Sequence, residues 1–191
     1  MGPAPPGHFV IEDNQFSDLT SIGLDVRAST SMDSLQRNPF ARITSAGGVP
    51  PGGALSINGN NVASNEYPTI LRARDNTFIG NDIAIQWLGT SSIGVSSDFG
   101  KVGDPGNNVF RCNSTAIGSA NGYDVDFTLP GDGTTTLWFA GNAWDHVPPS
   151  QANQSTAPNG TDVNIEASPG PQLVTDGAMP ATAACPAGRV P

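Results

Sequence analysis

Residues 75–87 read Asp-Asn-Thr-Phe-Ile-Gly-Asn-Asp-Ile-Ala-Ile-Gln-Trp, and weaker copies of this stretch recur before and after it. Each copy places an aromatic residue two positions after an asparagine. The pairs are Asn14 and Phe16, Asn76 and Phe78, Asn108 and Phe110, and Asn142 and Trp144. The last three asparagines are 32 and 34 residues apart, a spacing typical of proteins built from stacked repeats.

The composition favours short strands joined by turns. The 191 residues include 23 glycines and 17 prolines but a single lysine, and Asn, Thr and Ser are abundant. Strong helix formers are scarce, while residues that make turns are common. The length fits one domain. We therefore expect a single all-β domain.

Two segments alternate apolar and polar residues with the period of a β-strand. The series are Ile83, Ile85 and Trp87, and Tyr123, Val125, Phe127 and Leu129. A unit with two or three such strands cannot bury its apolar face alone, but stacked copies can. Stacking would place the four motif aromatics in one internal column and the four asparagines in another. Asparagine suits such a column because it tolerates a sharp bend and its amide can bond to the next coil.

The pattern also divides the chain into segments. Residues 1–8 are expected to form a disordered leader and residues 9–167 a solenoid, in which residues 29–66 form a degenerate coil with a loop excursion. Inside this coil, a single helical turn is expected from Met32 to Arg37, after a capping Ser31. Residues 168–191 are expected to form an extended, Pro-rich C-terminal tail.

The net charge of −9 argues against nucleic acid as a partner, because nucleic-acid-binding proteins concentrate Lys and Arg on one face. It disfavours an anionic membrane surface for the same reason. A divalent metal is compatible with this charge, and so is plain solubility. No stretch has the roughly 20 apolar residues of a membrane span, and the N-terminus lacks the features of a signal peptide.

The chain has two cysteines, Cys112 and Cys185, which are too few for a zinc site of their own. In an acidic, Lys-poor chain, such a pair favours one disulfide that joins the tail to the body. Two buried thiols without a disulfide are the alternative. A disulfide indicates export to the periplasm, the cell surface or the extracellular medium.

Two copies of the motif resemble the repeat of the right-handed parallel β-helix in pectin-lyase-like proteins. In residues 76–85 and 108–117, Asn-x-Phe is followed by Gly80-Asn81 or Cys112-Asn113 and then by an aliphatic pair. Residues 141–149, Gly-Asn-Ala-Trp-Asp-His-Val-Pro-Pro, are similar to the closing coil of secreted bacterial β-helix proteins. The resemblance covers roughly residues 9–165 and implies a right-handed parallel β-helix with irregular loops. It implies little about activity.

The N-terminal end of such a solenoid needs a cover. A bare first coil exposes apolar side chains and unpaired strand edges, and β-helices of this kind usually cover it with a helix. No segment before Phe9 has this character. We therefore expect that the chain is the C-terminal part of a longer solenoid, or that its N-terminal end docks on another chain.

Pectin-lyase-like enzymes are of two main chemical types, and each has recognisable motifs. The lyases use an Arg or Lys base with calcium held by several Asp, and the hydrolases use three Asp near a Gly-His-Gly and an Arg-x-Lys. Neither of these two hydrolase motifs occurs in this chain. Arg72 and Arg74 have the spacing of a clamp for a substrate carboxylate, but a solvated strand face has the same spacing.

Three further residues are candidates for chemistry. Asp124 and Asp126 would project from one strand to the same side, about 7 Å apart. That arrangement suits calcium or an inverting glycosidase, although a solvated strand face has the same pattern. His146 follows Asp145 and is the natural acid or base near neutral pH. Adjacent residues on an extended chain point apart, so a role in fixing a turn is favoured for this pair.

These observations predict a non-catalytic β-helical surface, adhesion or structural module of an exported bacterial protein, with a polysaccharide or a protein as partner. The first alternative is a polysaccharide-active enzyme, either a lyase or a glycoside hydrolase. The second is a scaffold or spike fragment that assembles end to end. No cofactor is required, and calcium is compatible with the candidate aspartates.

Overall fold

The computed structural model describes residues 8–27, 31–44, 53–58, 69–70, 72–88, 97–114, 122–127, 135–153, 158–166, 170–189 and 191. Over these residues the chain is all-β, and the ladders between its strands are parallel. This part of the chain has no helix of a length and apolarity that would cross a membrane.

Three strand positions recur in successive coils, and the strands at each position stack into one sheet. The first sheet contains β1 (His8–Glu12), β4 (Ser31–Gln36), β7 (Thr69–Ile70) and β8 (Ala73–Arg74). Backbone hydrogen bonds through Asp98 and Phe99 connect β8 to the pair β13 (Thr136–Trp138) and β17 (Gln172–Val174).

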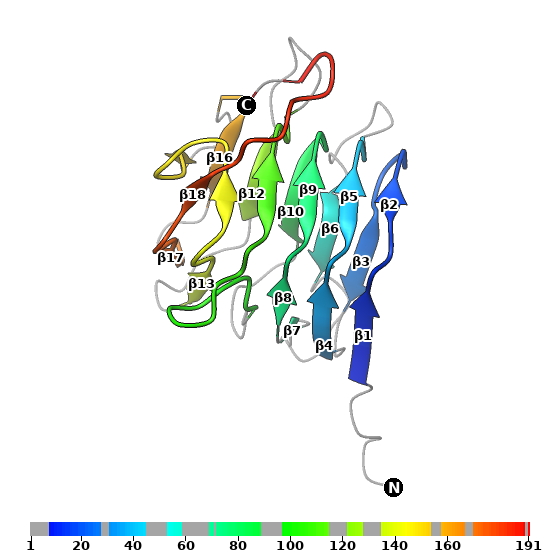
Figure 1. The fold of residues 1–191 in the computed structure, drawn as a ribbon, viewed down its shortest axis with the longest axis vertical. Helices are drawn as coiled ribbons and strands as arrows, with labels where there is room; N and C mark the ends of the chain where they lie inside the picture. The colour runs from blue at the N-terminus through cyan, green and yellow to red at the C-terminus, as the bar shows by residue number, and fades with distance from the viewer. Residues whose placement is uncertain are drawn as a thin grey trace, which may run out of the picture.

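The second sheet has the order β18 (Met179–Pro180), β14 (Ala143–Trp144), β11 (Val109–Arg111), β9 (Thr77–Ile79), β5 (Pro39–Ala41), β2 (Phe16–Ser17). The third has the order β15 (Gln151–Ala152), β16 (Thr161–Ile165), β12 (Tyr123–Phe127), β10 (Ile83–Leu88), β6 (Gly53–Asn58), β3 (Leu24–Arg27). Figure 1 shows the strands following one another along the molecule in chain order, from blue to red. The fold is a parallel β-helix, as the sequence predicts.

A column of asparagines links the coils between the first and second sheets. The backbone N–H of each donates to the side-chain Oδ1 of the asparagine in the next coil, at 2.9–3.0 Å. From the second asparagine on, the side-chain Nδ2 donates back to a carbonyl of the preceding coil. The column consists of Asn14, Asn38, Asn76, Asn108 and Asn142. The last four asparagines are fully buried, so this column holds the vertical register.

A second column is made of aromatic rings inside the helix. Consecutive ring centroids are 4.7, 4.8, 5.2 and 4.6 Å apart, close to the spacing of neighbouring strands. The column runs through Phe16, Phe40, Phe78, Phe110 and Trp144. Each stacked pair adds about 0.5–1.5 kcal/mol to the free energy gained by burial alone.

Asn38 and Phe40 belong to these columns, so the prediction of a degenerate coil over residues 29–66 is wrong for its described part. Residues 31–58 supply β4, β5 and β6, one strand to each sheet. The helical turn expected from Met32 to Arg37 is also wrong, because that segment is β4. Pro39 stands where the other copies have a backbone N–H that donates to the asparagine of the preceding coil. The coil tolerates this loss because the asparagine there, Asn14, is exposed.

Both ends of the expected domain also need correction. His8 begins β1, whereas the rest of the predicted leader lies outside the described residues. The solenoid does not stop at residue 167, because β17 pairs with β13 and β18 pairs with β14. The predicted tail therefore begins as a further, partial coil.

The end of the tail runs back over earlier coils. A disulfide joins Cys185 to Cys112, which is 73 residues earlier in the sequence. Arg189 forms an ion pair with Asp82 at 2.6 Å, four residues past the disulfide. Gly80 has a positive φ of 67°, and a Cβ there would lie 2.7 Å from Pro186. Covalent, ionic and steric contacts therefore all fix the tail against the body.

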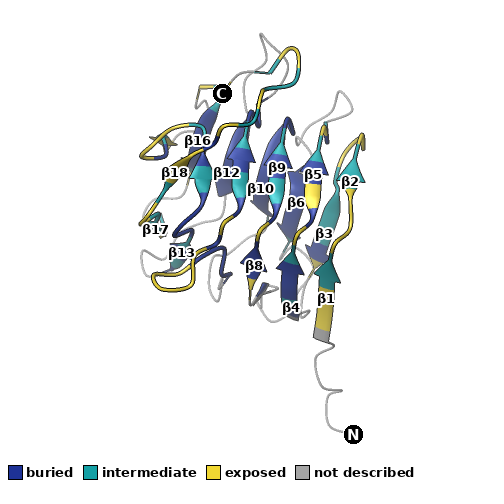
Figure 2. Cartoon of the chain, in the orientation of Figure 1, coloured by how far each residue is buried: buried dark blue, intermediate teal, exposed yellow. Residues whose placement is uncertain are grey.

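At the N-terminal end of the helix, none of the described strands pairs with the outer edge of β1, β2 or β3, and we call this end open. Figure 2 shows exposed residues on β1 and half-buried residues on β2, next to mostly buried strands in the middle coils. The side chains of Phe9 and Val10 are 51% and 60% exposed. Phe9 lines a hollow of about 340 Å³ together with residues that include Ile11, Leu24 and Met32. Within the described part of the chain, this end presents apolar side chains and one unpaired strand edge in each of the three sheets.

The asparagine column predicts an uneven response to alanine substitution. We expect Asn108→Ala to lower the free energy of unfolding by at least about 3 kcal/mol, because it leaves several buried donors and acceptors of neighbouring coils unpaired. Asn14→Ala, at the exposed end, should cost less than about 1 kcal/mol. Urea unfolding followed by circular dichroism measures both, and equal losses would contradict the role given to the column.

Candidate functional site

The structure gives Arg72 and Arg74 a structural use. The guanidinium of Arg74 is buried and forms ion pairs with Asp98 at 2.9 Å and Asp104 at 2.8 Å. Arg72 contacts the same Asp104 at 3.4 Å. Hydrogen bonds from Arg74 and Arg72 lower the pKa of Asp104 to about 2. The two arginines thus bind the same exposed carboxylate, Asp104, and tie the 98–104 loop to β8.

Asp124 and Asp126 lie on β12 as expected, but neither is on a solvated face. Their exposed fractions are 2% and 5%. The Asp124 carboxylate accepts a hydrogen bond from Asn113, whereas the Asp126 carboxylate accepts from Gln86 and Asn164. The structure therefore gives the two carboxylates different hydrogen-bond partners, in two polar clusters.

Asp126 belongs to a polar column on the third sheet. The register aligns it with Gln86 in the preceding coil and Asn164 in the next, and aligns Gln86 with Ser56. The amide of Asn164 donates to Asp126 at 3.0 Å. Burial raises the pKa of Asp126 to about 6, against the lowering effect of the Asn164 amide. A carboxylate in this column is ionised at neutral pH only at a cost in stability.

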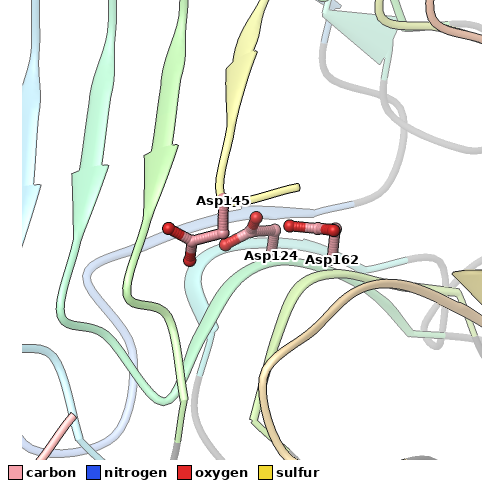
Figure 3. Close-up of side chains that lie close together, drawn as sticks. All are labelled: Asp124, Asp145 and Asp162. Carbon is pink, nitrogen blue, oxygen red and sulfur yellow. The ribbon is translucent and has the colours of Figure 1, made fainter. Parts of the chain in front are cut away.

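Asp124 lies in a cluster with Asp145 and Asp162. One carboxylate oxygen from each lies within 4.8 Å of the other two. Figure 3 shows the three side chains in a row, with Asp124 in the middle. Asp124 and Asp162 come from aligned positions of β12 and β16, and Asp145 follows β14. The cluster therefore joins two successive coils and two sheets.

The outer two carboxylates have partners on the protein. Asp145 accepts from the guanidinium of Arg111 and from the backbone N–H of Cys112. Asp162 Oδ2 accepts from the backbone N–H and the hydroxyl of Ser150, each at 2.6 Å, and lies 2.9 Å from His146 Nδ1. Burial raises the pKa of Asp145.

Asp124, in the middle, has the fewest hydrogen-bond partners of the three carboxylates. Its Oδ1 accepts from Asn113, while its Oδ2 has no partner among the described residues. Burial raises the pKa of Asp124 well above its usual range, and the charges of Asp162 and Asp145 raise it further. A proton or a cation beside Asp124 would reduce the repulsion between the three carboxylates and the cost of burying the Asp124 charge.

His146 binds Asp162 and not its neighbour Asp145, which agrees with the expectation that adjacent side chains diverge. Ser150 completes a Ser–His–Asp group, but the geometry is not that of a hydrolase. In such enzymes the serine and the aspartate bind opposite nitrogens of the histidine ring. Here the Ser150 hydroxyl donates to Asp162, and it lies 3.4 Å from the same Nδ1 that contacts Asp162. The group fixes the turn between β14 and β15.

Reasoning from the sequence alone missed Asp145 and Asp162 as partners of Asp124. A usable signal was present, because Thr161-Asp162-Val163-Asn164-Ile165 repeats the pattern of Tyr123-Asp124-Val125-Asp126-Phe127. Aligning these two strands puts Asp162 beside Asp124, as in the structure. Asp145 has no such signal, because its turn is specific to one coil.

Comparison with known families gives one match. The model of a family described as "Protein of unknown function (DUF1565)" matches residues 7–151. The chain belongs to the DUF1565 family. This family is associated with parallel β-helix proteins, in agreement with the fold. No curated protein and no solved structure matches the chain. The DUF1565 match includes Asp124 and Asp145 but ends before Asp162 and Cys185.

The raised pKa of Asp126 predicts a pH dependence of stability with a definite sign. The folded state holds the proton more tightly than the unfolded state, so the protein is stabilised at acidic pH and loses that stability as pH rises from about 4 to about 6. Asp126→Asn should remove this contribution and raise the free energy of unfolding at pH 7 by about 2–3 kcal/mol.

Unfolding curves at several pH values test this prediction. The difference between wild type and Asp126→Asn should be present at pH 7 and vanish near pH 4. Asp176→Asn, at an exposed position, serves as the control and should follow the wild type throughout. An Asp126→Asn protein that is less stable than wild type at pH 7 would contradict the argument.

Proposed function

We propose that this DUF1565 protein is a non-catalytic β-helical module of an exported bacterial protein, with a structural or surface role. One observation carries the proposal. All eight Lys and Arg side chains lie in the described part of the chain, and each is within 3.4 Å of a carboxylate of the same chain. The chain's own acids thus engage the cations that an acidic polysaccharide would need.

Many of these ion pairs connect successive coils. Arg37 on the second coil contacts Asp13 on the first at 2.8 Å, and Arg42 contacts Asp18 at 2.6 Å. Each of these exposed pairs adds little on its own. Repeated along the axis, they add to the register that the asparagine column sets. This use of charge supports a rigid module over an enzyme.

The alternative function is a polysaccharide-active enzyme. A lyase of the pectin-lyase-like type would need an Arg or Lys free to act as base, and the candidates Arg72 and Arg74 bind Asp104. A glycoside hydrolase would need carboxylates open to a polymer, and Asp124 and Asp126 are almost fully buried. Export is supported by the disulfide between Cys112 and Cys185.

The partner that the geometry supports best is a further parallel β-coil at the open N-terminal end. The asparagine column has a direction, because each backbone N–H donates towards the C-terminal side. Asn14 is the first asparagine of the column, so by the same pattern its Oδ1 would accept from the backbone N–H of an asparagine in a preceding coil. A coil of the same direction would supply the matching N–H. Two copies docked head to head would bring acceptor against acceptor, so self-association through this end is disfavoured.

At the C-terminal end, the described residues continue neither the asparagine column nor the ring stack. Ala178 aligns with Asn142 and ends the column, and Pro180 aligns with Trp144 and ends the ring stack. Proline on an edge strand cannot donate to a further ladder. Stacking of copies head to tail is therefore also disfavoured.

Addition of one coil tests the partner. A copy of residues 32–69 placed directly before Phe9 continues the register, because Phe9 aligns with Met32 and Met32 aligns with Ile70. We expect the extended chain to unfold at higher urea, because the added coil covers Phe9 and Val10 and pairs with the outer edges of β1, β2 and β3.

The control for the added coil is the same extension with the copied Asn38 and Phe40 changed to Ala and Ser. It should leave the urea midpoint near that of the unextended chain. The unextended chain should be a monomer by light scattering at both low and high concentration. Concentration-dependent assembly of that chain would favour the end-to-end scaffold instead.

The non-catalytic role predicts that the protein shows no activity on polysaccharides in an assay in which a known lyase is active. Incubation with a panel of acidic polysaccharides plus calcium should give neither unsaturated products nor new reducing ends. The sample should contain folded protein by circular dichroism, and a commercial pectate lyase should serve as the positive control. Product formation that Arg72→Ala or His146→Ala abolishes would overturn the proposal in favour of an enzyme.

A further inference from the structure

The acidic cluster contains more negative charge than its protein partners balance. Asp124, Asp145 and Asp162 have exposed side-chain fractions of a few per cent or less where they meet. Among the described residues, Arg111 supplies the ion pair with Asp145, and His146 contacts Asp162. Three buried carboxylates with one full positive charge would be strongly destabilising if all three were ionised.

Two carboxylate oxygens in the cluster lack a hydrogen-bond partner within the described part of the chain. Asp124 Oδ2 and Asp162 Oδ1 are fully buried and have no hydrogen-bond partner among the described residues. The two residues are 2% and 1% exposed. Figure 3 shows the Asp162 carboxylate directed at that of Asp124, which in turn lies beside Asp145. Unpartnered acceptors in such a place call for a positively charged ligand or a shared proton.

We propose that Asp124, Asp145 and Asp162 bind one calcium ion. Calcium takes oxygen ligands at about 2.3–2.6 Å, so two of its ligands can be up to about 5 Å apart. The three carboxylate oxygens lie within 4.8 Å of one another, which fits one shared ion of this size. A divalent cation also brings the charge of the three aspartates and Arg111 to zero.

The donor set favours calcium over other divalent metals. Zinc prefers nitrogen and sulfur ligands, but the nearest ring nitrogen, His146 Nδ1, contacts Asp162, and the nearby Cys112 is in the disulfide. Magnesium requires near-ideal octahedral geometry and usually keeps several waters. Calcium accepts irregular sets of carboxylates, such as three aspartates that come from two strands and a turn.

The ion would connect the coils at the C-terminal end. Asp124 belongs to β12, and Asp145 and Asp162 belong to the next coil. Asp145 also holds Arg111 and the backbone of Cys112, the residue that anchors the tail. Calcium would therefore stabilise the last two coils and the tail together. The inference does not depend on the proposed function, since a buried ion of this kind has a structural role in either an enzyme or a module.

Calorimetric titration of the EDTA-treated, dialysed protein with CaCl2 tests the inference. We expect one calcium per chain, and a higher thermal midpoint in CaCl2 than in EDTA. Asp124→Asn and Asp162→Asn should each weaken binding by at least about tenfold, because each removes a charged ligand. Asp124→Asn should also raise the midpoint in EDTA, because it relieves charge repulsion in the empty cluster.

The matched control is Asp126→Asn, which replaces a buried carboxylate on the same strand outside the cluster. It should keep the calcium-dependent rise in midpoint. Absence of heat and of any midpoint shift in the wild type would overturn the proposal and assign the two oxygens to a shared proton. Binding that survives both Asp124→Asn and Asp162→Asn would overturn the site. A shift with ZnCl2 but not with CaCl2 would overturn the choice of cation.

Discussion

The hydrogen bond from the backbone of one asparagine to the side chain of the next is the constraint on which this β-helix depends. Parallel strands that alternate apolar and polar residues can slip by two positions without changing which face is buried. The ring stack alone would resist such a slip only weakly, because neighbouring apolar residues could replace the displaced ring. The asparagine column makes a slip energetically unfavourable, because each buried donor or acceptor left unpaired destabilises the fold by about 1–3 kcal/mol. The amide column therefore selects one register from several that the core would accept.

The need to pair every buried amide also explains the position of the buried Asp124. A second, shorter column runs between the second and third sheets, where Asn81 accepts from Ile43 and Asn113 accepts from Asn81. The amide of Asn113 must then find an acceptor, and Asp124 supplies it at 2.8 Å. In the two preceding coils, the position of Asp124 is occupied by Ala84 and Ala54. No carboxylate is needed there, because the amide of Asn81 donates to the next asparagine, Asn113. The acidic cluster is thus the end of a polar column, built where an asparagine is no longer available.

The sequence predicted the parallel architecture because its strongest signal, an asparagine two residues before an aromatic, is tied to a physical requirement in every coil. The prediction failed for the coil that contains Asn38, where the signal is present but local residue preferences favoured a helical turn and a loop. Asn38-Pro39-Phe40 fits the pattern, yet proline is a strand breaker in most contexts, and Ser31 resembles a helix cap. The structure keeps the strand because Pro39 gives up only a bond to the exposed Asn14. Asp162 could have been aligned with Asp124 by strand pattern, whereas Asp145 depends on the path of a single turn, which no repeat encodes.

The two ends of the solenoid differ because its polar column has a direction. At the C-terminal end the column meets a tail that stops it with Ala178 and Pro180 and is fixed by the disulfide to Cys112. At the N-terminal end, Asn14 is the first asparagine of the column among the described residues, and it lies on the same first coil as the exposed Phe9 and Val10. A hydrophobic end alone would accept many partners, since burial of apolar surface is not directional. The direction of the asparagine column adds a geometric requirement, because only a coil of the same direction would present a backbone N–H to its first asparagine.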